Sequence, residues 1–193
     1  MTTLKLNLGS GQNPRLGYIN VDKYGTPDVK HDLEAFPWPW PDDSVSEVVL
    51  CHVLEHLGRR PSIYLDIMKE MYRVCQANAR IFIAAHHFRA DTFHADPTHV
   101  RAVTPTGLAL FSKRQNREWL AQGCANSPLA LYLGVDFELV RTAVKASEHW
   151  FRLHLGPDVD QDLLLREGAL YNNLIEEYQI ELRVIKEQGS MAR

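Results

Sequence analysis

The stretch Leu-Lys-Leu-Asn-Leu-Gly-Ser-Gly at residues 4–11 decides the fold. Its apolar residues up to Leu8 predict a first strand, and the glycines that follow predict a tight turn at the end of that strand. Glycine lets the backbone turn sharply and come close to a ligand. Because Gly-x-Gly by itself is equally typical of an ordinary turn, the next feature along the chain has to decide between the two.

That feature is a second apolar run, residues 18–21, which ends in Asp22. In doubly wound sheets, a carboxylate at the tip of the second strand accepts hydrogen bonds from ribose hydroxyls. Dinucleotide folds place this acid about 20 residues after the glycines, beyond a full helix. Here Asp22 comes only eleven residues after Gly11, which leaves no room for a regular crossover helix. The spacing favours a ligand without phosphates.

The rest of the chain alternates between strand and helix patterns. Apolar and β-branched runs predict further strands at residues 45–51, 80–85, 137–144 and 180–186, and helical spacing predicts helices at residues 62–75 and 161–175. Thr104 and Pro105 predict the N-cap and first residue of another helix, which would run through Phe111. Alternation of this kind predicts an α/β fold with a parallel sheet.

Composition and length narrow the class of protein further. The 193 residues suit a single domain over residues 1–193, and residues 86–135, rich in His, Pro and Thr, are expected to be an insertion that lines the acceptor site. The net charge of −3 does not favour nucleic acid as a partner, and no apolar run approaches the length of a membrane span. Without a visible signal peptide or paired cysteines, we expect a cytoplasmic protein of unknown oligomeric state.

Several short motifs then occur in a fixed order. They are Leu-Asn-Leu-Gly-Ser-Gly (6–11), Gly-Tyr-Ile-Asn-Val-Asp (17–22), His-Asp-Leu (31–33), Phe-Pro-Trp-Pro (36–39) and Cys-His-Val-Leu-Glu-His-Leu (51–57). Together they resemble class I methyltransferases that use S-adenosylmethionine (SAM), in the type-11-like group with a short first loop. The resemblance covers roughly residues 4–86. It implies a Rossmann-like doubly wound sheet, mostly parallel with an antiparallel last strand, and helices on both faces.

The resemblance also implies cofactor contacts at particular positions. These are Asn7, Gly9, Ser10 and Gly11 along the methionine part of SAM, Asp22 at the ribose, Asp32 and Leu33 at the adenine, and Cys51 and His52 on the sulfonium side. The chain departs from the family at Glu47, where an Asp is usual, and at residues 77–79, where Pro-Gly-Gly is usual. Both departures concern turns rather than ligand contacts.

Histidines follow two of the predicted strands, at the edge where ligands of open α/β sheets bind. His52, His86 and His99 are the candidate catalytic bases, because the pKa of imidazole lies near neutrality. Two further roles are open for them: His and Asp could bind a metal, or they could simply hydrogen-bond around the turn at Asp96. No metal-ligand spacing is present, so no metal site is assigned, while Glu55 is interpreted most simply as a favourable charge at a helix start.

The sequence therefore predicts a methyltransferase that moves the methyl group of SAM to an unidentified oxygen or nitrogen acceptor, with a small molecule as the expected acceptor. A non-catalytic, regulatory SAM-binding domain is the main alternative. An NAD-dependent oxidoreductase is less favoured because of the Gly11–Asp22 spacing. A module that uses residues 86–135 only for protein interaction would bind no nucleoside.

Overall fold

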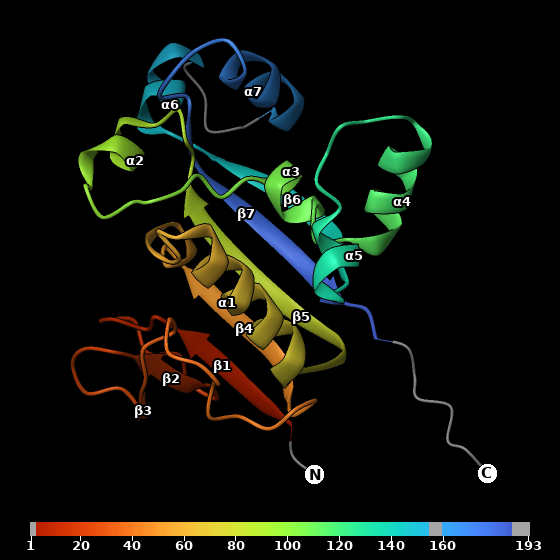
Figure 1. Cartoon of the computed structure of the whole chain (residues 1–193). Helices are drawn as coiled ribbons and strands as arrows, with labels where there is room; N and C mark the ends of the chain where they lie inside the picture. Colours follow the sequence, from red (N-terminus) through yellow and green to blue (C-terminus); the bar gives the residue numbers. More distant parts are fainter. Residues whose placement is uncertain (1–2, 155–159, 187–193) are drawn as a thin grey trace.

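The computed structural model describes residues 3–154 and 160–186, which form one seven-stranded sheet in the order β3-β2-β1-β4-β5-β7-β6 (Figure 1). The strands are β1 (Leu4–Leu8), β2 (Ile19–Asp22), β3 (Val29–Lys30), β4 (Val45–Cys51), β5 (Cys75–His86), β6 (Phe137–Ala146) and β7 (Ile175–Val184). The first five strands pair in parallel, and β7 runs antiparallel to both β5 and β6. The predicted Rossmann-like, mostly parallel sheet with an antiparallel last strand is confirmed.

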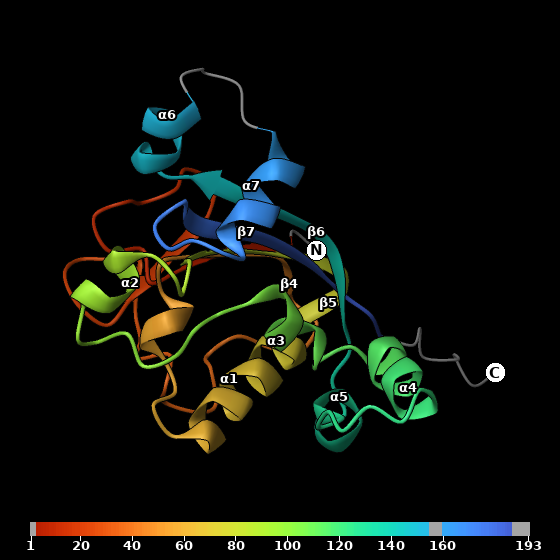
Figure 2. The same cartoon turned by 90° about the horizontal axis from the view of Figure 1, so that it is seen from above.

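One side of this sheet carries α1 (Pro61–Val74), α3 (Pro105–Ala109), α4 (Lys113–Ala121) and α5 (Leu129–Leu133) (Figure 2). Two further helices, α6 (Glu148–His154) and α7 (Gln161–Gly168), lie at the ends of β6 and β7. The amphipathic α1 buries Ile67, Met68 and Met71 completely. None of the helices in the described parts of the chain is long and apolar enough to cross a membrane.

Local sequence signals explain where several of these elements begin. Thr104 caps α3, as predicted, because its Oγ1 accepts a hydrogen bond from the Gly107 amide at 3.0 Å. Asp160 caps α7 in the same way. The helix predicted over residues 161–175 is too long, since α7 ends at Gly168 and Ile175 already begins β7. The last strand therefore begins earlier than residue 180, where the apolar run had placed its start.

Residues 9–44, all of them described, contain no helix, which confirms the expectation drawn from the Gly11–Asp22 spacing. Short loops connect β1, β2 and β3 instead. The outer face of β5 is consequently open to solvent: Phe82 is 40% exposed, and Arg80 forms an ion pair with Glu181 of β7 at 2.7 Å. The same short loops leave the carboxyl ends of β1 and β2 accessible, and this edge of the sheet holds the candidate site.

Candidate active site

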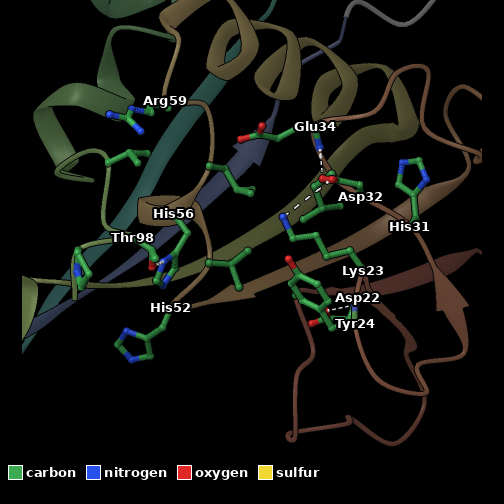
Figure 3. A pocket seen from close by; sticks show the side chains of 16 residues that line it. Asp22, Lys23, Tyr24, His31, Asp32, Glu34, His52, His56, Arg59 and Thr98 are labelled. Carbon is green, nitrogen blue, oxygen red and sulfur yellow. Dashed lines mark hydrogen bonds and ion pairs between the residues drawn. The ribbon is translucent and has the colours of Figure 1, made fainter.

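A cavity of about 620 Å³ lies at the carboxyl ends of β1, β2 and β4. Five of the residues with predicted cofactor contacts line it: Gly9, Asp22, Asp32, Leu33 and His52. Figure 3 shows Asp22 and Asp32 on one side of the cavity and His52 on the other, beside His56 and Thr98. We call the first side, formed by Gly9, Asp22, Asp32 and Leu33, the loop wall. Asn7, Ser10, Gly11 and Cys51 lie next to the cavity without lining it.

Gly9 is required by the shape of the loop wall. Its φ is +65°, and a Cβ placed on it would lie 2.4 Å from a methyl carbon of Val53. A branched valine side chain has little freedom to move away from such a contact. The φ of Gly11 is also positive, at +49°, but a Cβ there would meet nothing within 4 Å. Of the two glycines, only Gly9 is therefore needed for close packing.

Backbone amides hold the Asp22 carboxylate in place. Gly11 donates to its Oδ2 at 2.9 Å, and Tyr24 donates to its Oδ1 at 2.8 Å. Beneath this loop, the buried Asn7 side chain donates to Asn20 Oδ1 at 2.9 Å and to the Asn13 carbonyl at 3.1 Å. Asn7 and Gly11 thus shape the loop that presents Asp22.

The far part of the loop wall combines an acid with an apolar surface. Asp32 Oδ1 accepts a hydrogen bond from the Glu34 amide at 3.0 Å, and its Oδ2 lies 3.9 Å from Lys23 Nζ (Figure 3). The neighbouring Leu33 is buried, and Trp38 Nε1 donates to its carbonyl at 3.1 Å. This part of the loop wall therefore places a carboxylate beside an apolar side chain.

On the opposite side, His52 follows β4 in a conformation that is rare for a residue with a side chain, with φ of +54°. This backbone turns the imidazole toward β5 and β7. Its Nε2 lies 2.9 Å from Glu177 Oε2, and its Nδ1 lies 3.2 Å from His86 Nδ1. His86 and Glu177 are direct partners across the antiparallel β5–β7 pair, which places both beside the ring.

Glu55 completes this group from a short 3-10 helix, η1 (Leu54–His56). Its side chain is fully buried, and its Oε1 lies 3.2 Å from His86 Nδ1 and 3.5 Å from His52 Nδ1. Oε2 of the same carboxylate has no hydrogen-bond partner. We call His52, Glu55, His86 and Glu177 the histidine cluster. Glu55 is a full member of it, which goes beyond the helix-start charge expected from the sequence.

The members of the cluster shift one another's protonation. The Glu177 carboxylate, followed by Glu55, raises the pKa of His52 to about 10, and His52 in turn lowers the pKa of Glu177 to about 2. Burial and then the charge of His52 lower the pKa of His86. Burial opposes ionisation of Glu55, but hydrogen bonds from His52 and His86 still hold its pKa below the usual value. At neutral pH, His52 is an imidazolium and His86 is neutral.

The third candidate base, His99, belongs to an adjoining group of residues. Its ring centre lies 5.1 Å from that of His86 and 4.5 Å from that of His56, and its Nδ1 lies 2.7 Å from the Phe93 carbonyl. Asp96 forms the predicted turn, accepting from the Thr98 amide at 2.8 Å. The structure therefore brings all three candidate bases to one edge of the sheet.

Comparisons with solved structures identify the fold of this chain. No protein-family model and no curated protein matches the chain. A SAM-dependent methyltransferase from Archaeoglobus fulgidus superposes with a TM-score of 0.61 at 18% identity, covering 94% of this chain and 86% of that one. The chain has the class I methyltransferase fold. YcgJ from Bacillus subtilis is also similar, with a TM-score of 0.52 at 15% identity, covering 96% of this chain and 92% of that one. The 1,6-didemethyltoxoflavin-N1-methyltransferase of Burkholderia thailandensis, solved with S-adenosylhomocysteine, superposes with a TM-score of 0.52 at 11% identity. The match covers 95% of this chain and 71% of that one.

Within this methyltransferase fold, two members of the histidine cluster were missed by sequence reasoning. Glu177 sits near the beginning of β7, and an antiparallel strand begins at the edge where its parallel neighbours end. The predicted last strand started too late to include it. Glu55 had a signal that could have found it: it is acidic, stands three residues after His52, and lies in an otherwise apolar turn.

Proposed function

We propose that this protein is a SAM-dependent methyltransferase with a small-molecule oxygen or nitrogen acceptor. One observation carries the proposal: a single cavity has the loop wall on one side and His52, with its cluster, on the other. The loop wall could bind a nucleoside, and the histidine cluster could accept or donate a proton. A nucleoside site alone would suit a regulatory domain, whereas the cluster beside it is what catalysis needs.

The residues of the loop wall fit SAM. A volume of about 620 Å³ suits a ligand of this size, and the fixed Asp22 carboxylate can accept hydrogen bonds from both ribose hydroxyls. Asp32 and Leu33 would hold the adenine, and the close approach of backbone at Gly9 would accommodate the methionine part. When bound, SAM supplies a methyl group already activated on a sulfonium, so the protein needs mainly to align the acceptor.

The histidine cluster would handle the acceptor's proton. As the acceptor's lone pair forms the bond to the methyl carbon, the electron pair of the carbon–sulfur bond goes to sulfur, and the acceptor loses a proton. His86, whose pKa is lowered by burial, is neutral at physiological pH and lies 3.2 Å from His52 at the cavity wall, so it would take that proton through a bridging water, with the Glu55 carboxylate beside it to stabilise the resulting charge. His52 already carries a proton between two carboxylates, which favours a positioning role for it.

The charges around the cavity support a small acceptor rather than a nucleic acid. Asp22, Asp32 and Glu34 line the cavity, and Glu34 Oε1 accepts a hydrogen bond from the Gly58 amide at 2.7 Å. Lys23 and Arg59 line the cavity as well, so it lacks the excess of basic groups that a phosphate backbone requires. Pro97, Thr98 and Val100, which belong to the predicted insertion at residues 86–135, form another part of the lining.

Calorimetry with S-adenosylhomocysteine tests the cofactor assignment. Asp22→Ala removes both ribose acceptors and the contact to Gly11, so we expect affinity to fall by about 10- to 100-fold. Asp66→Ala is the matched control, because Asp66 lies on α1 and pairs only with Lys69 in an exposed i,i+3 contact. Equal affinity of the Asp22 variant and the wild type would refute SAM binding at this wall.

Turnover tests whether the protein is an enzyme. Purified protein, SAM and a pool of small metabolites should yield S-adenosylhomocysteine together with a methylated product, detected by mass spectrometry. The His86→Ala variant should give far less of both. Tight binding of S-adenosylhomocysteine without any turnover across chemically diverse acceptor pools would favour the regulatory alternative.

A further inference from the structure

The histidine cluster contains three potential metal-ligand atoms that converge on one point. We propose that His52 Nδ1, His86 Nδ1 and Glu55 Oε1 form a site for a divalent transition-metal ion, with zinc as the best fit. The site rests on contacts between these side chains alone, while its role in methyl transfer rests on the function proposed above. Three further arguments support it.

The first argument is geometric. The three atoms form a triangle with sides of 3.2, 3.2 and 3.5 Å. Zinc binds imidazole nitrogen and carboxylate oxygen at about 2.0–2.1 Å in a tetrahedron, which puts neighbouring ligand atoms about 3.3 Å apart. The triangle therefore has the size of one face of a zinc coordination tetrahedron, without any movement of the side chains.

His52 is also supported by residues that lie beyond the three ligand atoms. A histidine that binds metal usually donates its other ring N–H to a carboxylate, which fixes the tautomer and orients the ring. His52 Nε2 lies 2.9 Å from Glu177 Oε2 on the side of the ring away from the triangle. Gln179 Nε2 donates at 2.8 Å to the other oxygen of the same carboxylate. His52 thus has the supporting contacts of a metal-bound imidazole, and a bound ion would displace the proton that its Nδ1 otherwise carries.

The burial of the Glu55 carboxylate also favours a cation at this place. Its carboxylate is fully buried, yet Oε2 has no hydrogen-bond partner. Burying a carboxylate that has one oxygen unpaired is costly, and a cation bound at Oε1 would offset the negative charge that the whole carboxylate shares. The strained backbone of His52, at φ of +54°, points to the same conclusion, because such strain is retained where a side chain has to be aimed precisely.

A metal here would have a use in the reaction. Two histidines and one glutamate supply three ligands, and catalytic zinc sites keep a fourth position open for water or substrate. His52 also lines the cavity, so an ion bound to its Nδ1 would lie beside the space for the acceptor. With the ion bound, His86 would be a ligand instead of the base, and a hydroxyl oxygen in the open position would lose its proton more easily to solvent water in the cavity. This would favour oxygen acceptors.

Hydrogen bonds among His52, Glu55 and His86 would hold the same three atoms at similar distances without a metal. Metal content therefore distinguishes a hydrogen-bonded cluster from a metal site. The full-length protein should be purified without a histidine tag, dialysed with zinc and then against metal-free buffer, and analysed by plasma mass spectrometry. We expect about one zinc per chain. Cobalt(II), added to the zinc-free protein, should give the visible absorption bands of a tetrahedral site.

Variants locate the ion. Glu55→Gln and His86→Ala should abolish stoichiometric zinc, and Glu177→Gln should weaken zinc affinity by about 10- to 100-fold, since it changes only the residue behind His52. His94→Ala is the matched control, because His94 is exposed on α2 (Asp91–Ala95) and lies outside the triangle. Circular dichroism establishes that each variant is folded, and Glu55→Asp is a second, milder variant should Glu55→Gln fail to fold.

Two results would overturn the metal site. The first is that neither zinc nor cobalt(II) binds stoichiometrically to the wild type. The second is that zinc persists in folded Glu55→Gln and His86→Ala variants but is lost when His56 or His99, which form another group with Asp96, is replaced. Calorimetry with S-adenosylhomocysteine on the same samples separates the two proposals. Nucleoside binding without metal would overturn the metal site only, whereas metal without nucleoside binding would overturn the methyltransferase assignment only.

Discussion

The two sides of the cavity are built in opposite ways. The loop wall comes from one continuous part of the chain, residues 9–33, and backbone amides between two and eleven positions away hold its carboxylates. The histidine cluster comes from the ends of β4 and β5, from η1 and from the start of β7. Its members meet only because the register of the sheet places His86 opposite Glu177.

This difference suggests a division of labour. A wall made of local loops can bind a cofactor without depending on the rest of the molecule. A cluster that needs four separate elements is fixed by the fold itself, and such rigid placement favours the handling of a proton or a metal. Substitutions on the two sides should therefore affect different measurements.

The largest expected effect comes from removing His86, which belongs to the cluster and does not line the cavity. His86→Ala should lower the rate of methyl transfer by about 100-fold or more, because it removes a base or a metal ligand, while affinity for S-adenosylhomocysteine changes little. Asp32→Ala should do the reverse: weaker cofactor binding and a nearly unchanged rate at saturating SAM. Rates and calorimetry on both variants test this, and parallel losses in both would show that the two sides act as one.

A smaller effect is expected from Gly9 of the loop wall and from the neighbouring Gly11. Gly9→Ala should weaken S-adenosylhomocysteine binding by about 10-fold or more and lower the melting temperature, because its Cβ would lie 2.4 Å from Val53. Gly11→Ala is the comparison: only the positive φ is strained, at a cost of about 1–2 kcal/mol, since its Cβ meets nothing within 4 Å. Equal behaviour of the two variants in calorimetry and thermal melts would show that close packing at Gly9 is unimportant.

The same contrast explains how much could be predicted from the sequence. The strand, turn and acid at residues 4–22 are local patterns, so the helix-free loop and the position of Asp22 were predicted correctly. The sheet with its antiparallel last strand was implied by the family resemblance and is confirmed. Glu177 could not be found, because its place depends on the pairing of β5 with β7 and on a strand boundary that the apolar run does not mark. Burial of Glu55 is likewise a property of the folded chain.

The smallest effect concerns the support beneath the loop wall. Arg73 on α1 donates to the Trp38 carbonyl and to the Trp40 carbonyl, each at 3.0 Å, and Trp38 in turn donates to the Leu33 carbonyl. Arg73→Ala leaves these carbonyls without their charged donor, so we expect the free energy of unfolding to fall by about 1–3 kcal/mol in urea titrations. Because Leu33 moves with Trp38, cofactor affinity should fall only a few-fold.

Arg114→Ala is the control for this substitution. Arg114 makes an exposed i,i+4 pair with Glu118 on α4, a type of contact that contributes about 0.3–0.5 kcal/mol. Zinc content should be unaffected in both arginine variants, since the histidine cluster is held by strand register rather than by the tryptophan loop. Loss of zinc in Arg73→Ala would mean that disturbance of the loop wall reaches the cluster, and that the two sides of the cavity are mechanically coupled.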